Sequence, residues 1–282
     1  MMASSAATAG LSLLSAATWG GSDFAGGWGA RRASSLLITA CGQVVSLAGL
    51  LCICLALRLP VPNAKYLVFA AIGGFEGAFA LAIFYRALAM GAMGLTAAIT
   101  GLLTALIPVV FDLFHAGWPG ALTSTGLLLG LAAIWMISQS QETAGLGTPA
   151  KALLLGACAG VGFGAQLILF KLGAEGGVLW ALTSGRIAGS AAILLTVLVA
   201  RPQGGWRGFW LAGMISGTLD TVGNLFYMMA SQVGRLDVAA VICSMYPAGT
   251  ILLASVILRE KPTRRQLMGM GLALGAVALL SA

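Results

Sequence analysis

The sequence predicts an all-α integral membrane protein, with ten transmembrane helices in two inverted five-helix repeats around a central cavity. Three observations support this prediction: few charged residues, ten long apolar runs and an internal repeat. Of the 282 residues, 59% are hydrophobic and only 8% are charged, and the mean hydropathy is +0.98. Because a soluble domain carries about 25% charged residues, much of this chain's surface must face lipid.

The glycine content indicates helices rather than a β-barrel. The chain has 40 glycines, a residue that is more frequent in transmembrane helices than in soluble ones because it lets helix backbones approach closely. Barrel strands are alternating segments of about 10 residues, whereas the apolar runs here are about twice as long. We expect the Gly156-Gly160-Gly164, Gly213-Gly217 and Gly271-Gly275 series to be helix-packing surfaces.

Ten apolar runs have the length of about 20 residues that a helix needs to cross the hydrocarbon core. They are Thr8–Trp28, Ser35–Leu57, Tyr66–Ala89, Leu95–Phe114, Leu122–Ser138, Ala150–Leu172, Val178–Ala200, Trp206–Ala230, Val238–Leu258 and Leu267–Ala282. The longest polar link between them, Gln139–Pro149, is too short to fold as a domain. Catalysis in an extramembrane domain is therefore excluded.

The two halves of the chain, residues 1–142 and 143–282, resemble each other at a nearly constant offset of 142 residues. The offset places Gly20 on Gly162, Lys65 on Arg207, Phe84-Tyr85 on Phe226-Tyr227 and, one residue later, Pro119 on Pro262. Each half has five runs, an odd number, so the second half must enter the membrane from the opposite side. Inverted repeats of this kind place a substrate site near the midplane, which favours a transporter.

Ionisable residues inside spans are costly and are candidates for function. They are Asp23, Glu76, Asp112, Arg186 and Asp220. Helical pitch places Glu76, Phe79, Ala80 and Ile83 on one face of the third run, and Asp220, Asn224 and Tyr227 on one face of the eighth. We expect both stripes to face the pathway, although Glu76 could also be a structural carboxylate that is neutral or paired.

The remaining candidates each have two interpretations. Asp23 lies in the glycine-dense stretch Gly20–Gly29, where the glycines could permit a broken helix that Asp23 lines, or could serve close packing with Asp23 capping a helix end. Arg186 needs a buried acid as partner, or it binds a substrate carboxylate. Trp19, Trp135 and Phe163 could line an apolar cavity or pack as ordinary core residues. His115, at the end of the fourth run, is expected to be interfacial rather than a proton relay.

No cofactor or metal is expected. The five cysteines lie in apolar runs without a C-x-x-C pair, which predicts buried free thiols, and the chain has one histidine. No G-x-x-x-x-G-K-[ST] motif occurs, which excludes ATP-driven pumping by this chain alone. Its basic residues are scattered between apolar runs, so nucleic acid is not expected as a partner. The expected partners are a small-molecule substrate and the bilayer, with the chain acting as a monomer. Transport is coupled to an ion, is an exchange, or runs down the substrate's own gradient; if the ion is a proton, Glu76, Asp23 or Asp220 could carry it.

The second half contains a series of short motifs: Asp237-Val-Ala-Ala-Val, Tyr246-Pro247, Arg259-Glu260-Lys261-Pro262, Gln266-Leu267-Met268-Gly269 and Gly275. In this order they resemble the EamA repeat of the drug/metabolite transporter superfamily. The opening stretch Trp19–Phe24 is similar to that of the YddG amino-acid exporters. The first half departs from the pattern, because Ala105 stands where Pro247 would pair and no glutamate stands opposite Glu260.

The resemblance implies a secondary transporter that exports small metabolites, amino acids above all, across a bacterial inner membrane. It also implies a cavity lined by the third, fourth, eighth and ninth helices with the first and sixth. The alternatives are a drug or nucleotide-sugar carrier of the same fold, a channel, or an intramembrane enzyme using Asp23 and Asp220 as an aspartyl pair. The last two belong to other classes, and the chain has neither an H-E-x-x-H nor a G-x-S-G motif.

The basic residues predict the orientation. The even-numbered links and the tails carry four: Arg58, Lys65, Lys171 and Arg235. The odd-numbered links carry ten: Arg31, Arg32, Arg86, Lys151, Arg201, Arg207, Arg259, Lys261, Arg264 and Arg265. Because cytoplasmic loops carry the excess of Lys and Arg, the odd-numbered links are expected in the cytoplasm and both termini outside.

Overall fold

A computed structural model of the chain describes residues 2–30, 32–90, 93–137, 150–202, 209–257 and 262–281. Within these residues every regular element is an α-helix. The helices are α1 (Met2–Ala30), α2 (Ser35–Ala56), α3 (Ala64–Ala89), α4 (Met93–His115), α5 (Ala121–Ile137), α6 (Ala150–Ala174), α7 (Val178–Ala200), α8 (Phe209–Val233), α9 (Leu236–Cys243), α10 (Tyr246–Ile257) and α11 (Arg264–Ser281).

Each apolar run of the sequence overlaps one of these helices or, in one case, two of them. Five helical segments are long and apolar enough to cross a membrane by a strict criterion: Ser35–Ala56, Ala64–Leu88, Ala150–Ala174, Val178–Ala200 and Leu236–Ile257. The chain is therefore a multi-pass membrane protein. The run ends at Ser138, Trp206, Leu258 and Ala282, and the link Gln139–Pro149, lie outside the described residues.

Two expectations about helix continuity were wrong. The ninth run is two helices, because Pro247 lacks an N–H and its ring would clash with the carbonyl group four residues earlier, so α9 ends at Cys243 and α10 begins at Tyr246. By contrast, α1 continues unbroken through Gly20–Gly29, so Asp23 neither lines a helix break nor caps a helix end. The α1 glycines serve close packing instead: a Cβ on Gly20 would lie 2.7 Å from the Tyr246 carbonyl oxygen.

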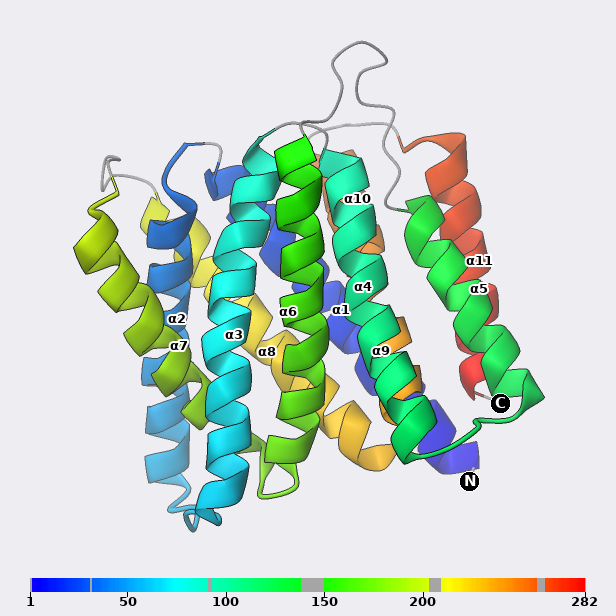
Figure 1. The fold of residues 1–282 in the computed structure, drawn as a ribbon, viewed down its shortest axis with the longest axis horizontal. Helices are drawn as coiled ribbons and strands as arrows, with labels where there is room; N and C mark the ends of the chain where they lie inside the picture. Colours follow the sequence, from blue (N-terminus) through cyan, green and yellow to red (C-terminus); the bar gives the residue numbers. More distant parts are fainter. Residues whose placement is uncertain are drawn as a thin grey trace.

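The most extensive contacts join helices of the first half to helices of the second. The helix α1 packs on α8 and α10, α3 on α6 and α7, α4 on α6, and α5 on α11, while α2 contacts both α7 and α8. Figure 1 shows α3, α6 and α4 in neighbouring positions, with α5 and α11 at one edge of the bundle. The interior of the protein is therefore built between the halves rather than within either one.

Glycines allow the closest of these contacts. A Cβ on Gly217 of α8 would lie 2.2 Å from the Gly42 Cα of α2, and a Cβ on Gly74 of α3 would lie 2.1 Å from the Gly185 carbonyl oxygen of α7. Real Cβ atoms do not come this near a neighbouring backbone. These two helix pairs therefore approach at distances that no other residue type permits.

The predicted packing series were right in two cases and wrong in one. A Cβ on Gly213 would meet α2, and those on Gly156, Gly160 and Gly164 would meet α4. Nothing lies within 4 Å of a Cβ on Gly271 or Gly275, so these two glycines of α11 face outward.

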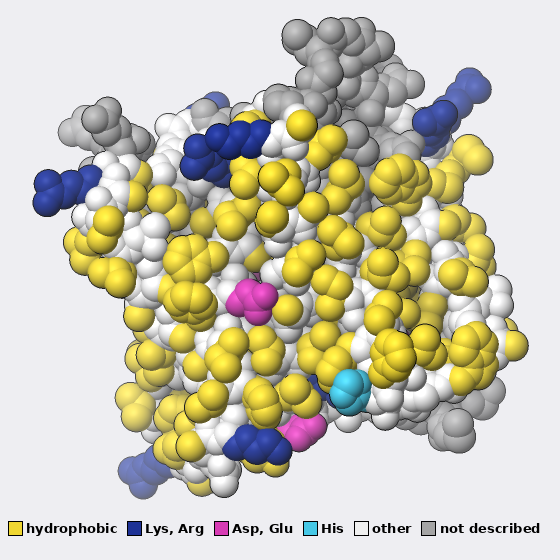
Figure 2. All heavy atoms as spheres, viewed as in Figure 1, with side chains coloured by type: hydrophobic (Ala, Val, Ile, Leu, Met, Phe, Trp, Pro, Cys, Tyr) yellow, Lys and Arg dark blue, Asp and Glu magenta, His cyan; other side chains and the backbone are white. Residues whose placement is uncertain are grey.

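The outer surface is that of a protein in lipid. Figure 2 shows hydrophobic side chains covering the middle of the molecule, with Lys and Arg confined to its two ends. Large apolar side chains are exposed on this surface, including Phe114, Val199, Leu128 and Leu195 at 81%, 77%, 69% and 62%. Cys52 and Cys158 are also exposed, so the expectation of five buried thiols was wrong for them; an apolar run does not distinguish lipid-facing from core positions.

The Gly42–Gly217 contact predicts a large effect of one methyl group. Gly217→Ala should lower the free energy of unfolding by about 3 kcal/mol, because the new Cβ collides with backbone and forces α2 and α8 apart. The matched control is Gly49→Ala on α2, which meets nothing within 4 Å and should be neutral or slightly stabilising. Unfolding by SDS in mixed micelles measures both variants, and equal midpoints would contradict the prediction.

Candidate functional site

A small cavity lies between the two halves of the chain. Its walls come from α1, α3, α4, α6, α8 and α10. The lining residues are Trp19, Asp23, Leu81, Thr104, Phe163, Gln166, Leu167, Asp220, Asn224 and Tyr246. Five of them are sequence-predicted candidates, namely Trp19, Asp23, Phe163, Asp220 and Asn224.

The other five lining residues were missed by sequence reasoning. For Thr104 and Tyr246 a signal was present, because the repeat offset of 142 places one on the other and Tyr246 directly precedes the helix-breaking Pro247. No such signal was present for Leu81, Gln166 and Leu167, since an amide or a leucine in an apolar helix can pack against a neighbouring helix as well as line a cavity.

Aromatic rings form part of the cavity wall, and one of them, Trp19, packs against a buried ring. The Trp19 ring centroid lies 6.4 Å from that of Tyr246 in an edge-to-face arrangement and 6.0 Å from that of Tyr227. Tyr227 is fully buried, and its hydroxyl donates to the Leu167 carbonyl oxygen at 2.6 Å. Tyr227 therefore packs against the Trp19 ring and does not line the cavity itself.

An ion pair joins α7 to the cavity. The Arg186 guanidinium of α7 donates to the Asp220 carboxylate of α8, and the two side chains are 7% and 16% exposed. Asn224, one turn later on α8, donates its side-chain amide to the Asp220 main-chain oxygen at 2.8 Å. The acid that Arg186 needs is therefore Asp220, and the pair leaves a carboxylate edge at the cavity wall.

Asp23 lines the same cavity but, unlike Asp220, has no counter-charge among the described residues. Among the described residues, none hydrogen-bonds to its carboxylate or forms an ion pair with it, and its charge interacts unfavourably with that of Asp220. Its neighbour Ser22 donates to the Ser216 carbonyl oxygen at 2.9 Å, and Tyr85 shares a 2.8 Å hydrogen bond with the Ser216 hydroxyl. These contacts join α1 and α3 to α8 at Ser216, and Ser22 is next to Asp23 in sequence.

The stripe of Glu76, Phe79, Ala80 and Ile83 does not line the cavity. Glu76 is partly buried where α3 meets α6, and its Cγ would lie 3.8 Å from a Cβ on Gly162. It is the one acidic residue of α3, and α6 has none. The Glu76 side chain is intermediate between buried and exposed, so the carboxylate is not enclosed in the core.

The rest of the stripe packs against neighbouring helices and rings. Ala80 is buried against Gly162, because a Cβ added to Gly162 would lie 2.9 Å from the Cβ of Ala80. The Phe79 ring lies 5.2 Å from that of Phe75, and Ile83 packs against a buried cluster that contains Phe84. Trp135 is 39% exposed on α5 and lies away from the cavity.

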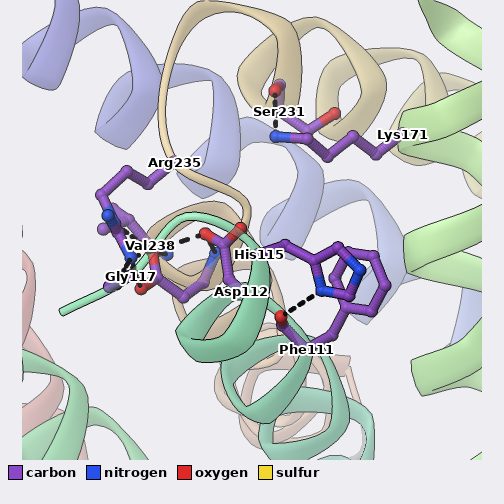
Figure 3. A network of polar contacts seen from close by, with 9 residues as sticks. Phe111, Asp112, His115, Gly117, Lys171, Ser231, Arg235 and Val238 are labelled. Atoms are coloured by element: carbon purple, nitrogen blue, oxygen red, sulfur yellow. Dashed lines mark hydrogen bonds and ion pairs between the residues drawn. The ribbon is translucent and has the colours of Figure 1, made fainter. Parts of the chain in front are cut away.

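A second polar cluster lies at the end of the bundle, outside the cavity (Figure 3). Arg235, in the link between α8 and α9, donates to both Asp237 carboxylate oxygens at 2.8–3.2 Å and lies 3.7 Å from the Asp112 carboxylate. Asp112 also accepts the Asp237 N–H at 3.2 Å. The hydrogen bonds to Asp237 raise the pKa of Arg235, so the guanidinium remains charged and bridges α4 to α9.

His115 is part of this end of the molecule rather than of the cavity. Its ring stacks on Phe111 with centroids 3.9 Å apart, and its Nδ1 donates to the Phe111 carbonyl oxygen at 2.9 Å. The side chain is exposed, as expected of an interfacial histidine. Within the described residues, no three His, Cys, Asp or Glu side chains gather as a metal site would require.

The Arg186–Asp220 pair predicts a compensating pair of substitutions. Arg186→Gln should lower the free energy of unfolding by roughly 3 kcal/mol, because it leaves the Asp220 carboxylate buried without its counter-charge. Adding Asp220→Asn removes that charge and should restore most of the loss. SDS unfolding in mixed micelles measures both proteins. If the double variant is no more stable than Arg186→Gln alone, the pair does not act as a unit.

The comparisons with known proteins agree with this architecture. One solved crystal structure, described only as that of a protein, superposes with a TM-score of 0.74 over 98% of this chain and 96% of its own, at 20% sequence identity, and thus shares the fold. No curated protein matches the chain. Residues 150–282 match the EamA-like transporter family, whose members are membrane transporters of small solutes rather than enzymes. The second half of the chain is therefore an EamA-like transporter domain.

Proposed function

We propose that the whole chain is a secondary transporter that exports small metabolites, namely amino acids including neutral and aromatic ones, by alternating access. The observation that carries the proposal is the cavity between the halves, which combines charged groups with aromatic walls. A few polar groups in a mostly apolar lining are typical of small-molecule binding sites. An amino acid carries both the charged and the apolar groups that such a lining would bind.

The proposal includes ten membrane spans in two inverted repeats, residues 1–142 and 143–282, whose boundary lies outside the described residues. The packing of the helices supports it. When each helix is replaced by its counterpart 142 residues away, the contact of α1 with α8 becomes that of α6 with α3, and the contact of α2 with α8 becomes that of α7 with α3. Such an exchange of contacts is expected of two repeats that rock about a midplane site.

The site residues fit the same exchange. Tyr85 and Tyr227, which are equivalent by the offset, are both completely buried. Thr104 and Tyr246, also equivalent, both line the cavity. The match of the family to residues 150–282 supports the second half directly, and the repeat extends the proposal to the first half.

The bacterial inner membrane and extracytoplasmic termini complete the proposal. Both chain ends lie toward the same end of the bundle in Figure 1, as an even number of spans requires. The excess of Lys and Arg in the odd-numbered links supports a cytoplasmic position for them, although Arg31, Arg207, Arg259 and Lys261 lie outside the described residues. We propose a functional monomer driven by proton coupling, with Glu76, Asp23 or Asp220 as the proton carrier.

The alternatives fit the cavity less well. A nucleotide-sugar carrier must accept a pyrophosphate dianion, and the unpaired Asp23 carboxylate in this cavity repels such a group. An intramembrane aspartyl enzyme needs two carboxylates that share a proton, whereas Asp220 is engaged by Arg186. A drug carrier of the same fold is compatible with the cavity and differs from an amino-acid exporter only in its ligand.

Efflux from proteoliposomes tests the proposal. Vesicles loaded with a panel of radiolabelled amino acids should show saturable, selective efflux that an imposed pH gradient accelerates. If Glu76 carries the proton, Glu76→Gln should abolish the pH effect. The matched control is Glu175→Gln, an exposed acid in the link after α6 that should leave flux unchanged.

Each outcome of this experiment has a definite meaning. A pH effect that persists in Glu76→Gln indicates that Asp23 or Asp220 carries the proton instead. Absence of flux for every amino acid contradicts the amino-acid proposal and leaves drugs or other small metabolites as substrates.

A further inference from the structure

The charges that line the cavity do not balance. Asp23 and Asp220 are two carboxylates, and the one guanidinium beside them, that of Arg186, is engaged with Asp220. No lysine or arginine is among the cavity-lining residues, and no described residue pairs with Asp23. The cavity therefore holds one carboxylate without a partner of opposite charge.

A second polar group of the cavity also lacks a partner. The hydroxyl of Tyr246 is fully buried, and within the described part of the chain it makes no hydrogen bond. Its ring and Asp23 both belong to the cavity lining. An unmade hydrogen bond of a buried hydroxyl costs about 1–3 kcal/mol, so a ligand that supplies a partner gains affinity.

The aromatic lining adds a third feature. Trp19, Phe163 and Tyr246 contribute rings to the wall, and Trp19 meets Tyr246 edge to face. The faces of such rings attract ammonium groups through their quadrupoles, and they also pack against an apolar body. One unpaired carboxylate, one unpaired hydroxyl and several rings are together the lining expected around an organic cation.

We propose that Asp23, assisted by the Tyr246 hydroxyl, binds the ammonium group of the transported molecule, and that the substrate class is amines with an apolar or aromatic body. The inference rests on the transport function proposed above and names the chemistry of its substrate. A carboxylate on the substrate is dispensable, because the guanidinium that could bind it is held by Asp220. A substrate that has a carboxylate and no amine meets the like charge of Asp23 and is rejected.

A matched ligand series tests this selectivity on the unmodified protein. The probes are phenethylamine, L-phenylalaninamide, L-phenylalanine and 3-phenylpropionate, which share one ring and differ in charge. Calorimetric titration of the full chain in lipid nanodiscs should give phenethylamine and phenylalaninamide affinities equal to or above that of phenylalanine. The affinity for 3-phenylpropionate should be at least about tenfold lower, since it lacks the charge-assisted hydrogen bond.

Two variants locate the ammonium site. Asp23→Asn should weaken phenethylamine binding by about 10–100-fold, the value of a hydrogen bond to a charged group, and Tyr246→Phe should weaken it by a smaller factor. Glu175→Gln, exposed in a link, is the control with unchanged affinity. Elution as a monodisperse peak on size exclusion verifies that each variant is folded, and the ligand series decides the question even if Asp23→Asn does not fold.

The outcomes separate this inference from the proposed function. Binding of 3-phenylpropionate as tight as that of phenethylamine, or wild-type affinity for phenethylamine in folded Asp23→Asn, overturns the inference. If proteoliposomes nevertheless show saturable amino-acid efflux, the transport function stands without it. If no probe binds and no amino acid is transported, both proposals fail.

Discussion

The close backbone contacts of Gly42 with Gly217 and of Gly74 with Gly185 are the constraint on which the rest of the structure depends. Lipid tails are as apolar as leucine, so helices in a bilayer gain little from burying apolar side chains and associate through tight packing and hydrogen bonds. At both contacts a single Cβ would overlap backbone of the partner helix. Ser46 adds a hydrogen bond to the Gly217 carbonyl oxygen at 2.8 Å, which becomes available because the helices are so near.

These contacts also position the charged groups. Arg186 directly follows Gly185 on α7, and Asp220 lies one turn beyond Gly217 on α8. The close contacts of α7 with α3 and of α8 with α2 therefore fix the backbone positions of the two charged residues. The ion pair then forms with little loss of side-chain conformational entropy. Asp220, held in this way, presents its remaining surface to the cavity.

Sequence reasoning located the helices and the charged cavity residues because those features follow from strong physical penalties. A charge in an apolar run is costly, so Asp23 and Asp220 stood out, and both line the cavity. Apolar positions gave no such signal, because a residue facing lipid and a residue facing another helix are equally hydrophobic. For that reason the stripe of Glu76, which was expected to face the pathway, is absent from the cavity lining, and Gly271 and Gly275 were mistaken for packing positions.

The fold satisfies some of its buried polar side chains and leaves others without a partner. Ser22, Tyr85 and Tyr227 are buried between helices, and each has its hydrogen bond. The Tyr246 hydroxyl has no partner among the described residues, and the same holds for the buried side chains of Gln43 and Ser190, which lie outside the cavity. An unmatched neutral group costs a few kcal/mol, whereas an unpaired charge costs far more. What distinguishes Asp23 is therefore its charge together with its place in the cavity lining, where a molecule of opposite charge can reach it.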